Sequence, residues 1–153
     1  MINNDVLRSL RYMLNINEQQ LVDIVTLGGA DLDAATLELM LKKEEDEGYL
    51  ACSDTIMAQC LDGLVYSKRG KDDSRPAQPL ELPMSNNIVL KKLRVAFELK
   101  EDDMHRIMDS VDCPVSKPEM SALFRKYGHS NYRDCGDQFL RNFLKGLTLR
   151  VRG

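Results

Sequence analysis

The chain has 153 residues, of which 43% are hydrophobic and 29% charged, and its formal net charge is −3. This balance is typical of a soluble, folded protein of one domain or two small ones, and it excludes disordered and collagen-like chains. No apolar stretch reaches the ~20 residues of a membrane helix, and the first residues lack a basic segment followed by an apolar signal core. We therefore expect a cytoplasmic protein without a membrane partner.

A tandem duplication is the strongest feature of the sequence. Residues 4–70 align with residues 87–153 at a constant offset of 83, with 16 identities in 67 positions and no gap. We therefore divide the chain into a first repeat (1–70), a linker (71–86) and a second repeat (87–153). The linker contains three prolines, which favour an extended, semi-rigid spacer: Pro76, Pro79 and Pro83.

Apolar residues of the first repeat recur at three- and four-residue steps, which indicates helices. The first helix is expected after Asn4 and the second after Asn17, whose side chain can form a capping box with Gln20. Gly28-Gly29 ends the second helix, since glycine adopts the left-handed conformation found at helix ends. A third helix is expected after Asp33, with its end near the acidic run at residues 44–47, and a fourth is expected from about residue 54.

The second repeat shows the same order of elements. Its third helix is expected to begin at Ser116, to bury a stripe that runs as far as Tyr127, and to end at Gly128. Its fourth helix is expected from about residue 137. The sequence therefore predicts an all-α protein in which a compact unit of about four helices occurs twice.

The pattern of duplicated segments resembles a known family. The segments are residues 10–12, 42–49 and 61–70, and the last of these recurs at 143–153. Together they are similar to the YehS-like family of bacterial proteins, a family of unknown function. The resemblance covers nearly the whole chain and implies no catalytic or binding residue.

A second, weaker resemblance is to helix-turn-helix domains of the phage-repressor type. The segments 93–94, 101–108, 116–127 and 137–147 follow the order of helices in such domains. The predicted turn of about six residues is longer than the three or four residues usual for this motif.

Charge separates the repeats. The first has 6 Lys and Arg against 12 Asp and Glu, whereas the second has 13 against 9. Four polar residues of the second repeat are the candidates for contacts with nucleic-acid phosphates, because a helix would place them opposite its apolar stripe: Lys117, Ser121, Arg125 and Lys126. The open alternative is a solvated face, or one that meets the acidic repeat.

Matched residues of the two repeats suggest structural roles. Arg11 and Arg94 lie in apolar helix stripes, and we predict that each pairs with the Asp of its own repeat, Asp54 or Asp137, or with the carbonyls around Tyr49 and Tyr132. Matched tyrosines and cysteines are expected to fill the corner between the third and fourth helices: Tyr49, Tyr132, Cys52 and Cys135.

Nothing in the sequence favours catalysis. There is no phosphate-binding glycine loop, zinc-protease helix or supported catalytic triad, and no Cys/His pair has metal-ligand spacing. His105 and His129 are expected at the surface and the cysteines in the core, although pairing of His129 with Cys113 or Cys135 stays open. We expect no enzyme activity, cofactor, metal or small-molecule substrate.

Two functions remain. The first is a non-catalytic helical binding protein that contacts nucleic acid through its basic second repeat, with a regulatory role. The alternative is a protein-interaction adaptor or homo-oligomer in which acidic and basic repeats meet, with no nucleic-acid role.

Overall fold

A computed structural model describes residues 1–74, 76 and 78–153. This part of the chain forms eight helices and no strand, four helices in each repeat. In the first repeat they are α1 (Asn3–Leu14), α2 (Glu18–Leu27), α3 (Ala34–Met40) and α4 (Asp54–Arg69); in the second they are α5 (Asn86–Ala96), α6 (Glu101–Asp109), α7 (Lys117–Leu123) and α8 (Asp137–Arg152). The all-α, duplicated architecture is confirmed. None of the described helices is both long and apolar enough to cross a membrane.

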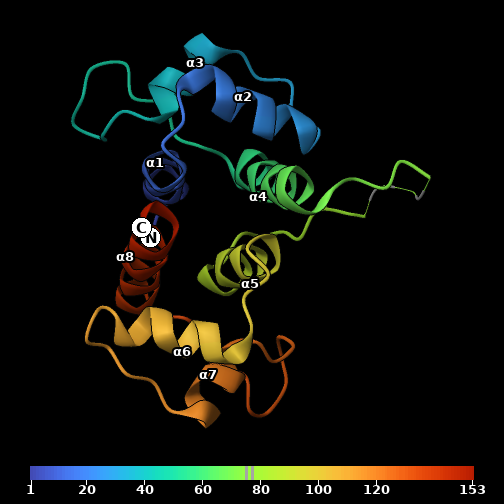
Figure 1. Ribbon diagram of the computed structural model, residues 1–153. Helices are drawn as coiled ribbons and strands as arrows, with labels where there is room; N and C mark the ends of the chain where they lie inside the picture. The colour runs from blue at the N-terminus through green and yellow to red at the C-terminus, as the bar shows by residue number, and fades with distance from the viewer. Residues whose placement is uncertain (75, 77) are drawn as a thin grey trace.

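The helices stack in four tiers (Figure 1). In this view α2 and α3 lie at the top, α1 and α4 below them, then α8 and α5, and α6 and α7 at the bottom. Within the repeats α2 packs on α4 and α6 packs on α8, and between the repeats α4 packs on α5 and α1 on α8. The two repeats therefore dock through their first and fourth helices, and their buried apolar residues form one continuous core.

Helix starts follow the predicted capping residues. Asn17 and Gln20 form the predicted capping box, Asp33 accepts from the N–H of Thr36, and Ser116 accepts from the N–H of Glu119. The second helix ends at Gly28 as expected. Because these caps are local interactions, the sequence alone predicts them well.

The third helices are shorter than predicted. Helix α7 ends at Leu123 rather than near Gly128, and α3 ends at Met40. In each case a carbonyl at the helix end accepts from a distant N–H and, along the chain, from the N–H three residues further on. The N–H of Arg133 donates to the carbonyl of Ala122 (3.1 Å), and the matched N–H of Leu50 donates to that of Leu39 (3.2 Å).

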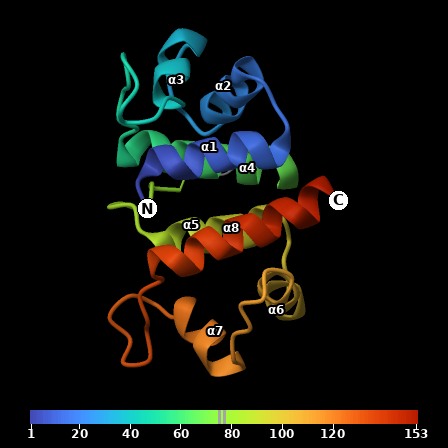
Figure 2. The same cartoon turned by 90° about the vertical axis from the view of Figure 1, so that its left-hand side faces the viewer.

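The interface between the repeats has approximate two-fold symmetry, because a contact between one pair of residues recurs between their counterparts 83 positions away. The guanidinium of Arg69 donates to the carbonyl of Val95 (3.2 Å), and that of Arg152 donates to the carbonyl of Tyr12 (2.6 Å). Helix α1 therefore runs parallel to α8, as Figure 2 shows, and α5 runs parallel to α4.

The described part of the linker forms no helix as far as Ser85, and its predicted last residue, Asn86, is the first residue of α5. It leaves the end of α4 as a loop on the side away from α1 and α8 (Figure 1). The predicted spacer includes residues 75 and 77, which lie outside the described residues. Its last residues, Glu81 to Ser85, pack against the second repeat, where they line a cavity.

Candidate functional site

An asparagine holds the loop between the third and fourth helices in each repeat. The side-chain amide of Asn4 donates to the carbonyls of Met40 (2.9 Å) and Leu50 (2.9 Å), and its oxygen accepts from the N–H of Cys52 (3.0 Å). Asn4 is only 2% exposed. Its three bonds fix the end of α3 and the approach to α4, so its role is structural.

The second repeat reproduces this arrangement. Asn87 donates to the carbonyls of Leu123 (3.0 Å) and Arg133 (2.9 Å) and accepts from the N–H of Cys135 (2.8 Å). The identity of Asn4 and Asn87 was visible in the aligned repeats, but their role was not, since a helix was expected to begin only after Asn4. In the structure Asn4 lies inside α1.

The preceding asparagines form a second matched pair. Asn3 donates to Asp54 Oδ1 (2.8 Å), and Asn86 donates to Asp137 Oδ1 (2.8 Å). An alignment that begins at residue 4 misses this pair, although Asn3 and Asn86 are also 83 positions apart. Because both aspartates begin a fourth helix, the asparagines tie the start of the first helix to the start of the fourth.

The prediction for the two arginines is wrong, since among the described residues neither binds the aspartate or the carbonyls around the tyrosine of its own repeat. Arg11 Nη2 lies 3.3 Å from Glu18 Oε1. Arg94 Nε donates to the carbonyl of Leu99 (3.1 Å), and the guanidinium lies 4.6 Å from the centre of the Phe124 ring. The aspartates are already bound by Asn3 and Asn86, so the arginines contact the beginning of the second helix or an aromatic ring instead.

The corner between the third and fourth helices contains the matched tyrosines and cysteines. Cys52 and Cys135 are buried there, and Tyr49 and Tyr132 are half-buried. Burial raises the pKa of Cys52 to about 11 and that of Cys135 to about 12, each with help from the following aspartate. Such thiols stay protonated at neutral pH and are poor nucleophiles.

The four residues predicted to contact phosphates do not share one helix face. Lys117 and Ser121 lie in α7, whereas Arg125 and Lys126 follow its end. Lys117 lines a cavity with His105 and Arg106, and Arg125 and Lys126 line a different one. The prediction required α7 to extend to about residue 127, and the early end of the helix separates the residues.

The cavity beside Arg125 and Lys126 combines cations with aromatic rings. It has a volume of about 750 Å³ and lies between the end of the linker, the start of α5 and the loop after α7. We call it the aromatic cavity; the aromatic and charged residues that line it are Glu81, Lys91, Phe124, Arg125, Lys126, Tyr127, Tyr132 and Asp134.

The two tyrosines of the aromatic cavity form an edge-to-face pair, with ring centres 5.4 Å apart and planes at 76°. Tyr127 is 83% exposed, so it is not the core residue that the helical spacing predicted. Burial raises the pKa of Tyr132 to about 12, and a hydrogen bond with Asp134 contributes. Tyr132 is thus the half-buried ring of the pair, and Tyr127 is the exposed one.

Some charged residues of the aromatic cavity already have an ion-pair partner, and others do not. Glu81 is bound by Lys91 (2.9 Å) and also lies near Lys92 (3.6 Å). Among the described residues, neither Arg125 nor Lys126 forms an ion pair, and both are exposed. Two free cations therefore stand beside an exposed aromatic ring.

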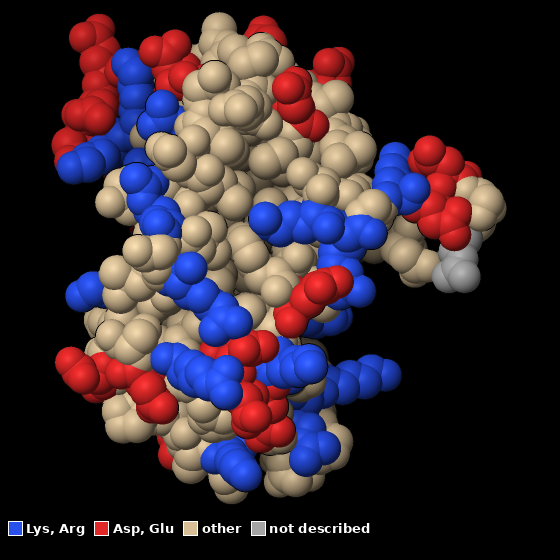
Figure 3. Space-filling view, in the orientation of Figure 1, with Lys and Arg blue, Asp and Glu red and all other residues tan. Residues whose placement is uncertain are grey.

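The matched loop of the first repeat lacks this combination. Glu44 stands at the position of Tyr127, and residues 44–47 are all acidic. Figure 3 shows acidic side chains over the upper repeat, with lysine and arginine gathered mainly along the middle and lower part of the molecule. The loop after α3 is therefore an internal control for the loop after α7.

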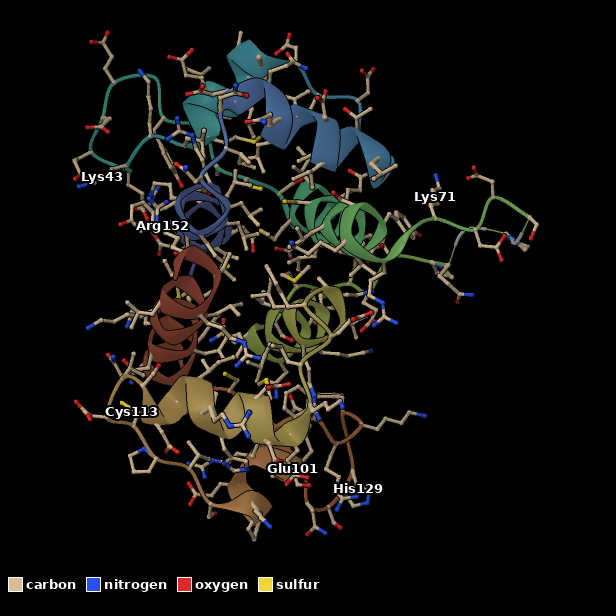
Figure 4. The ribbon with its side chains drawn as sticks, viewed as in Figure 1. Lys43, Lys71, Glu101, Cys113, His129 and Arg152 are labelled. Atoms are coloured by element: carbon tan, nitrogen blue, oxygen red, sulfur yellow. The ribbon has the colours of Figure 1, made fainter. Side chains whose placement is uncertain are left out.

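Cys113 and His129 do not form a pair in the structure. Cys113 and His129 lie on opposite sides of the second repeat (Figure 4). The Nδ1 of His129 accepts from the N–H of Asn131 (3.0 Å), and Cys113 Sγ accepts from the amide of Asn142 (3.1 Å). Within the part of the chain that the structure describes, no three His, Cys, Asp or Glu residues gather as metal ligands.

Helix-turn-helix geometry is not supported. Residues 110–116 separate α6 from α7, a longer connection than the three- or four-residue turn of that motif. Helix α7 is also short, at 7 residues. The likeness to phage repressors rested on the order of helices alone.

Comparisons of the sequence with known proteins identify the family of the chain. The family described as "Protein of unknown function (DUF1456)" matches twice, at residues 3–70 and 86–153. The chain is also 49% identical to "Uncharacterized protein YehS" of Escherichia coli (strain K12) over 150 residues, which is 98% of this chain and 96% of that protein. No solved structure matches it. Because both repeats are matched separately, the chain belongs to this family of unknown function.

Proposed function

We propose that the protein is a non-catalytic binding protein that contacts single-stranded nucleic acid through the aromatic cavity of its second repeat. The observation that supports this most is the exposed ring of Tyr127, which pairs with Tyr132 and lines the same cavity as the cations Arg125 and Lys126. Single-strand binding proteins use such pairs, since aromatic rings stack on bases while cations contact phosphates.

Duplex recognition is the weaker form of this proposal. A duplex keeps its bases stacked, so that an exposed tyrosine beside a cavity offers it little. Helix α7, whose apolar side faces the core with Met120 and Leu123, has only Lys117 as a cation on its outer surface. A single strand can present unstacked bases to Tyr127 and phosphates to Arg125 and Lys126.

The adaptor alternative has one supporting observation. Residues 44–47 are exposed, and the carboxylates of Glu44, Glu45 and Glu47 form no ion pair among the described residues. Such a loop could meet a basic surface of another chain. Sedimentation of the pure protein at low and high salt tests this form of the proposal.

The experiment uses the full chain, because the docked repeats would expose core residues if they were separated. Fluorescence anisotropy with a labelled 20-nucleotide single strand measures the dissociation constant between about 50 and 200 mM salt. Replacing Tyr127 with Ala is expected to weaken binding by about 1–3 kcal/mol, because the ring no longer stacks on a base. Replacing Arg125 and Lys126 with Ala is expected to lower the salt slope by about 0.7 for each phosphate that the variant no longer neutralises.

Lys43 supplies the matched control, since it occupies the position of Lys126 in the first repeat. Lys43→Ala removes the same charge from the acidic loop and should leave both affinity and salt slope unchanged. Absence of single-strand binding at 50 mM salt, roughly the low end of the range in which phosphate contacts are strong, would overturn the proposal. Equal losses from Lys43→Ala and Lys126→Ala would also contradict it.

A further inference from the structure

The approximate two-fold symmetry of the repeat interface leaves one of its two sides without its carboxylates. On the α4/α5 side, Lys92 binds Asp62 (2.8 Å) and Arg69 binds Glu98 (3.3 Å). On the α1/α8 side, the positions of Asp62 and Glu98 are taken by Lys145 and Asn15. The backbone contacts recur on the α1/α8 side, but the two carboxylates that neutralise Lys92 and Arg69 on the α4/α5 side have no counterpart there.

A groove of about 670 Å³ follows the α1/α8 side. Four cationic side chains line it, and no Asp or Glu does among the described residues: Arg8, Arg141, Lys145 and Arg152. Figure 2 looks onto the two parallel helices that form its walls, and in Figure 4 Arg152 lies where α8 meets α1. We call it the α1/α8 groove.

The cations of the α1/α8 groove differ in how firmly they are held. Arg8 is fixed by Asp5 and by the carbonyl of Lys42. Arg152 is fixed by the carbonyl of Tyr12, and its guanidinium lies 4.4 Å from the centre of that ring. Arg141 and Lys145 form no ion pair within the described residues, and both are exposed.

The spacing of these cations suits an anion with several linked charged groups better than an anion with a single charge. Arg141 and Lys145 are one helical turn apart on α8, or about 6 Å along the axis. A chain of linked phosphates has a similar length, and guanidinium groups bind phosphate oxygens with two parallel hydrogen bonds. Arg8 lies on the facing helix, so the phosphates would be held from both walls.

The other end of the groove is partly apolar. Tyr12 is 63% exposed and Leu149 is 52% exposed, and both line the groove near Arg152. An organic group attached to the phosphates could cover these side chains. The groove volume also lies in the range usual for small-molecule sites, roughly 300–1,000 Å³.

We propose that the α1/α8 groove binds a small organic polyphosphate of nucleotide size, with its phosphates between Arg8, Arg141 and Lys145 and its organic part against Tyr12 and Leu149. The carboxylates of the α4/α5 side show where anions sit in the equivalent interface. This site is separate from the aromatic cavity and does not depend on the function proposed for it.

The test makes the α1/α8 side resemble the α4/α5 side. The double variant Ser9→Lys with Lys145→Asp supplies the counterparts of Lys92 and Asp62, so that an internal ion pair replaces the ligand. Calorimetry of the full chain with ATP, and separately with inorganic triphosphate, should show one site in the wild type. In the double variant the affinity should fall at least about tenfold, which is 1.4 kcal/mol.

Controls separate this outcome from loss of structure or of net charge. The urea midpoint of the double variant should match or exceed that of the wild type, because it gains an ion pair. Lys117→Ala changes the net charge by the same amount outside the groove and should bind ATP normally. Tyr127→Ala should also bind ATP normally, even if it no longer binds a single strand.

Three outcomes would overturn the proposal. The first is that neither ATP nor inorganic triphosphate binds the wild type at 50 mM salt, roughly the condition in which phosphate contacts are strongest. The second is that the folded double variant binds them as tightly as the wild type. The third is that only an oligonucleotide binds and no longer does so in the double variant, which would make the groove a nucleic-acid surface.

Discussion

Asp54 accepts a hydrogen bond from the backbone N–H of Met84 (3.1 Å), across the boundary between the repeats. The amino group of Met1 makes the equivalent contact with Asp137. Each aspartate also accepts from the asparagine that begins the first helix of its own repeat. The aspartate at the start of α4, and likewise the one at the start of α8, thus binds residues at the beginning of both α1 and α5 or just before them. These contacts link the fold of each repeat to its position on the other.

Replacing Asn4 with Ala should strongly destabilise the protein. The change leaves two carbonyls and one N–H without their partner in a site that is 2% exposed. We expect the free energy of unfolding in urea to fall by about 2–4 kcal/mol, since each buried unsatisfied group costs about 1–3 kcal/mol. Asn87→Ala should cost less, because Asn87 is only half-buried. A smaller loss for Asn4→Ala than for Asn87→Ala would contradict this account.

Glycines at the helix contacts should not tolerate a methyl group. A Cβ on Gly63 would lie 1.8 Å from the carbonyl oxygen of Ile24, and one on the matched Gly146 would lie 2.5 Å from that of Ile107. We expect Gly63→Ala to lower the free energy of unfolding by about 3 kcal/mol or more, and Gly146→Ala by somewhat less. Gly136→Ala is the control, because a Cβ there meets nothing within 4 Å. Thermal or urea unfolding of the three variants measures the difference.

Sequence patterns predicted the number of helices and most of their starts, because Asn17, Asp33 and Ser116 act on N–H groups three residues away. The ends of the third helices were missed for a physical reason. The carbonyls at those ends bind Asn4 and Asn87, which are 36 residues away. No local pattern reveals such a partner.

The candidate site was predicted only in part. Arg125 and Lys126 do lie beside a cavity, but Lys117 does not share it, because the helix expected to align the three residues ends early. The α1/α8 groove was not anticipated, since its cations come from both repeats and meet only when the repeats dock. The alignment of the repeats places Lys145 at the position of Asp62. The sequence alone does not show that this difference matters, because it does not show that both positions lie at the interface.

Three of the four thiols should react slowly in the native protein. Burial raises the pKa of Cys60 and Cys135 to about 12 and that of Cys52 to about 11, from 9.0. At pH 8 we expect a thiol reagent to label the half-buried Cys113 first and the other three only in denaturant. Rapid labelling of all four thiols in the native state would show that the corner is open.

The same thiols predict a loss of stability at alkaline pH. A raised pKa in the folded state means that the folded protein binds more protons than the unfolded chain above pH 9.0, the ordinary value. The thiols therefore contribute fully below pH 9.0, and their contribution falls as the pH rises toward about 12. Urea unfolding at pH 7, 9 and 10.5, roughly spanning this window, should show a falling free energy of unfolding. Substitution of Cys60 by Ala should reduce the slope of that fall, whatever its effect at pH 7.

The ion pair between Lys92 and Asp62 is expected to stabilise the docked repeats. Their side chains are 22% and 14% exposed and lie 2.8 Å apart. Burial alone would lower the pKa of Lys92, but the hydrogen bonds and charges of Asp62 and Glu81 outweigh it and raise the pKa. Replacing Asp62 with Ala should therefore lower the free energy of unfolding at pH 7 by about 1–2 kcal/mol, less than for a fully buried pair because Glu81 remains 3.6 Å from the ammonium.

The pH dependence of that variant identifies the cause. A raised lysine pKa stabilises the folded state at pH values below 10.5, the ordinary value, and this contribution is lost as the pH rises through the folded-state pKa. The difference in the free energy of unfolding between wild type and Asp62→Ala should be constant from about pH 7 to 9 and shrink above 10.5, whereas the loss due to the thiols affects both proteins equally.

Glu98→Ala is the control, since its partner Arg69 is 43% exposed and also binds the carbonyl of Val95. We expect that variant to change the free energy of unfolding by less than about 0.5 kcal/mol, as for other exposed pairs. Equal effects of Asp62→Ala and Glu98→Ala would assign the stabilisation to overall charge rather than to the half-buried pair.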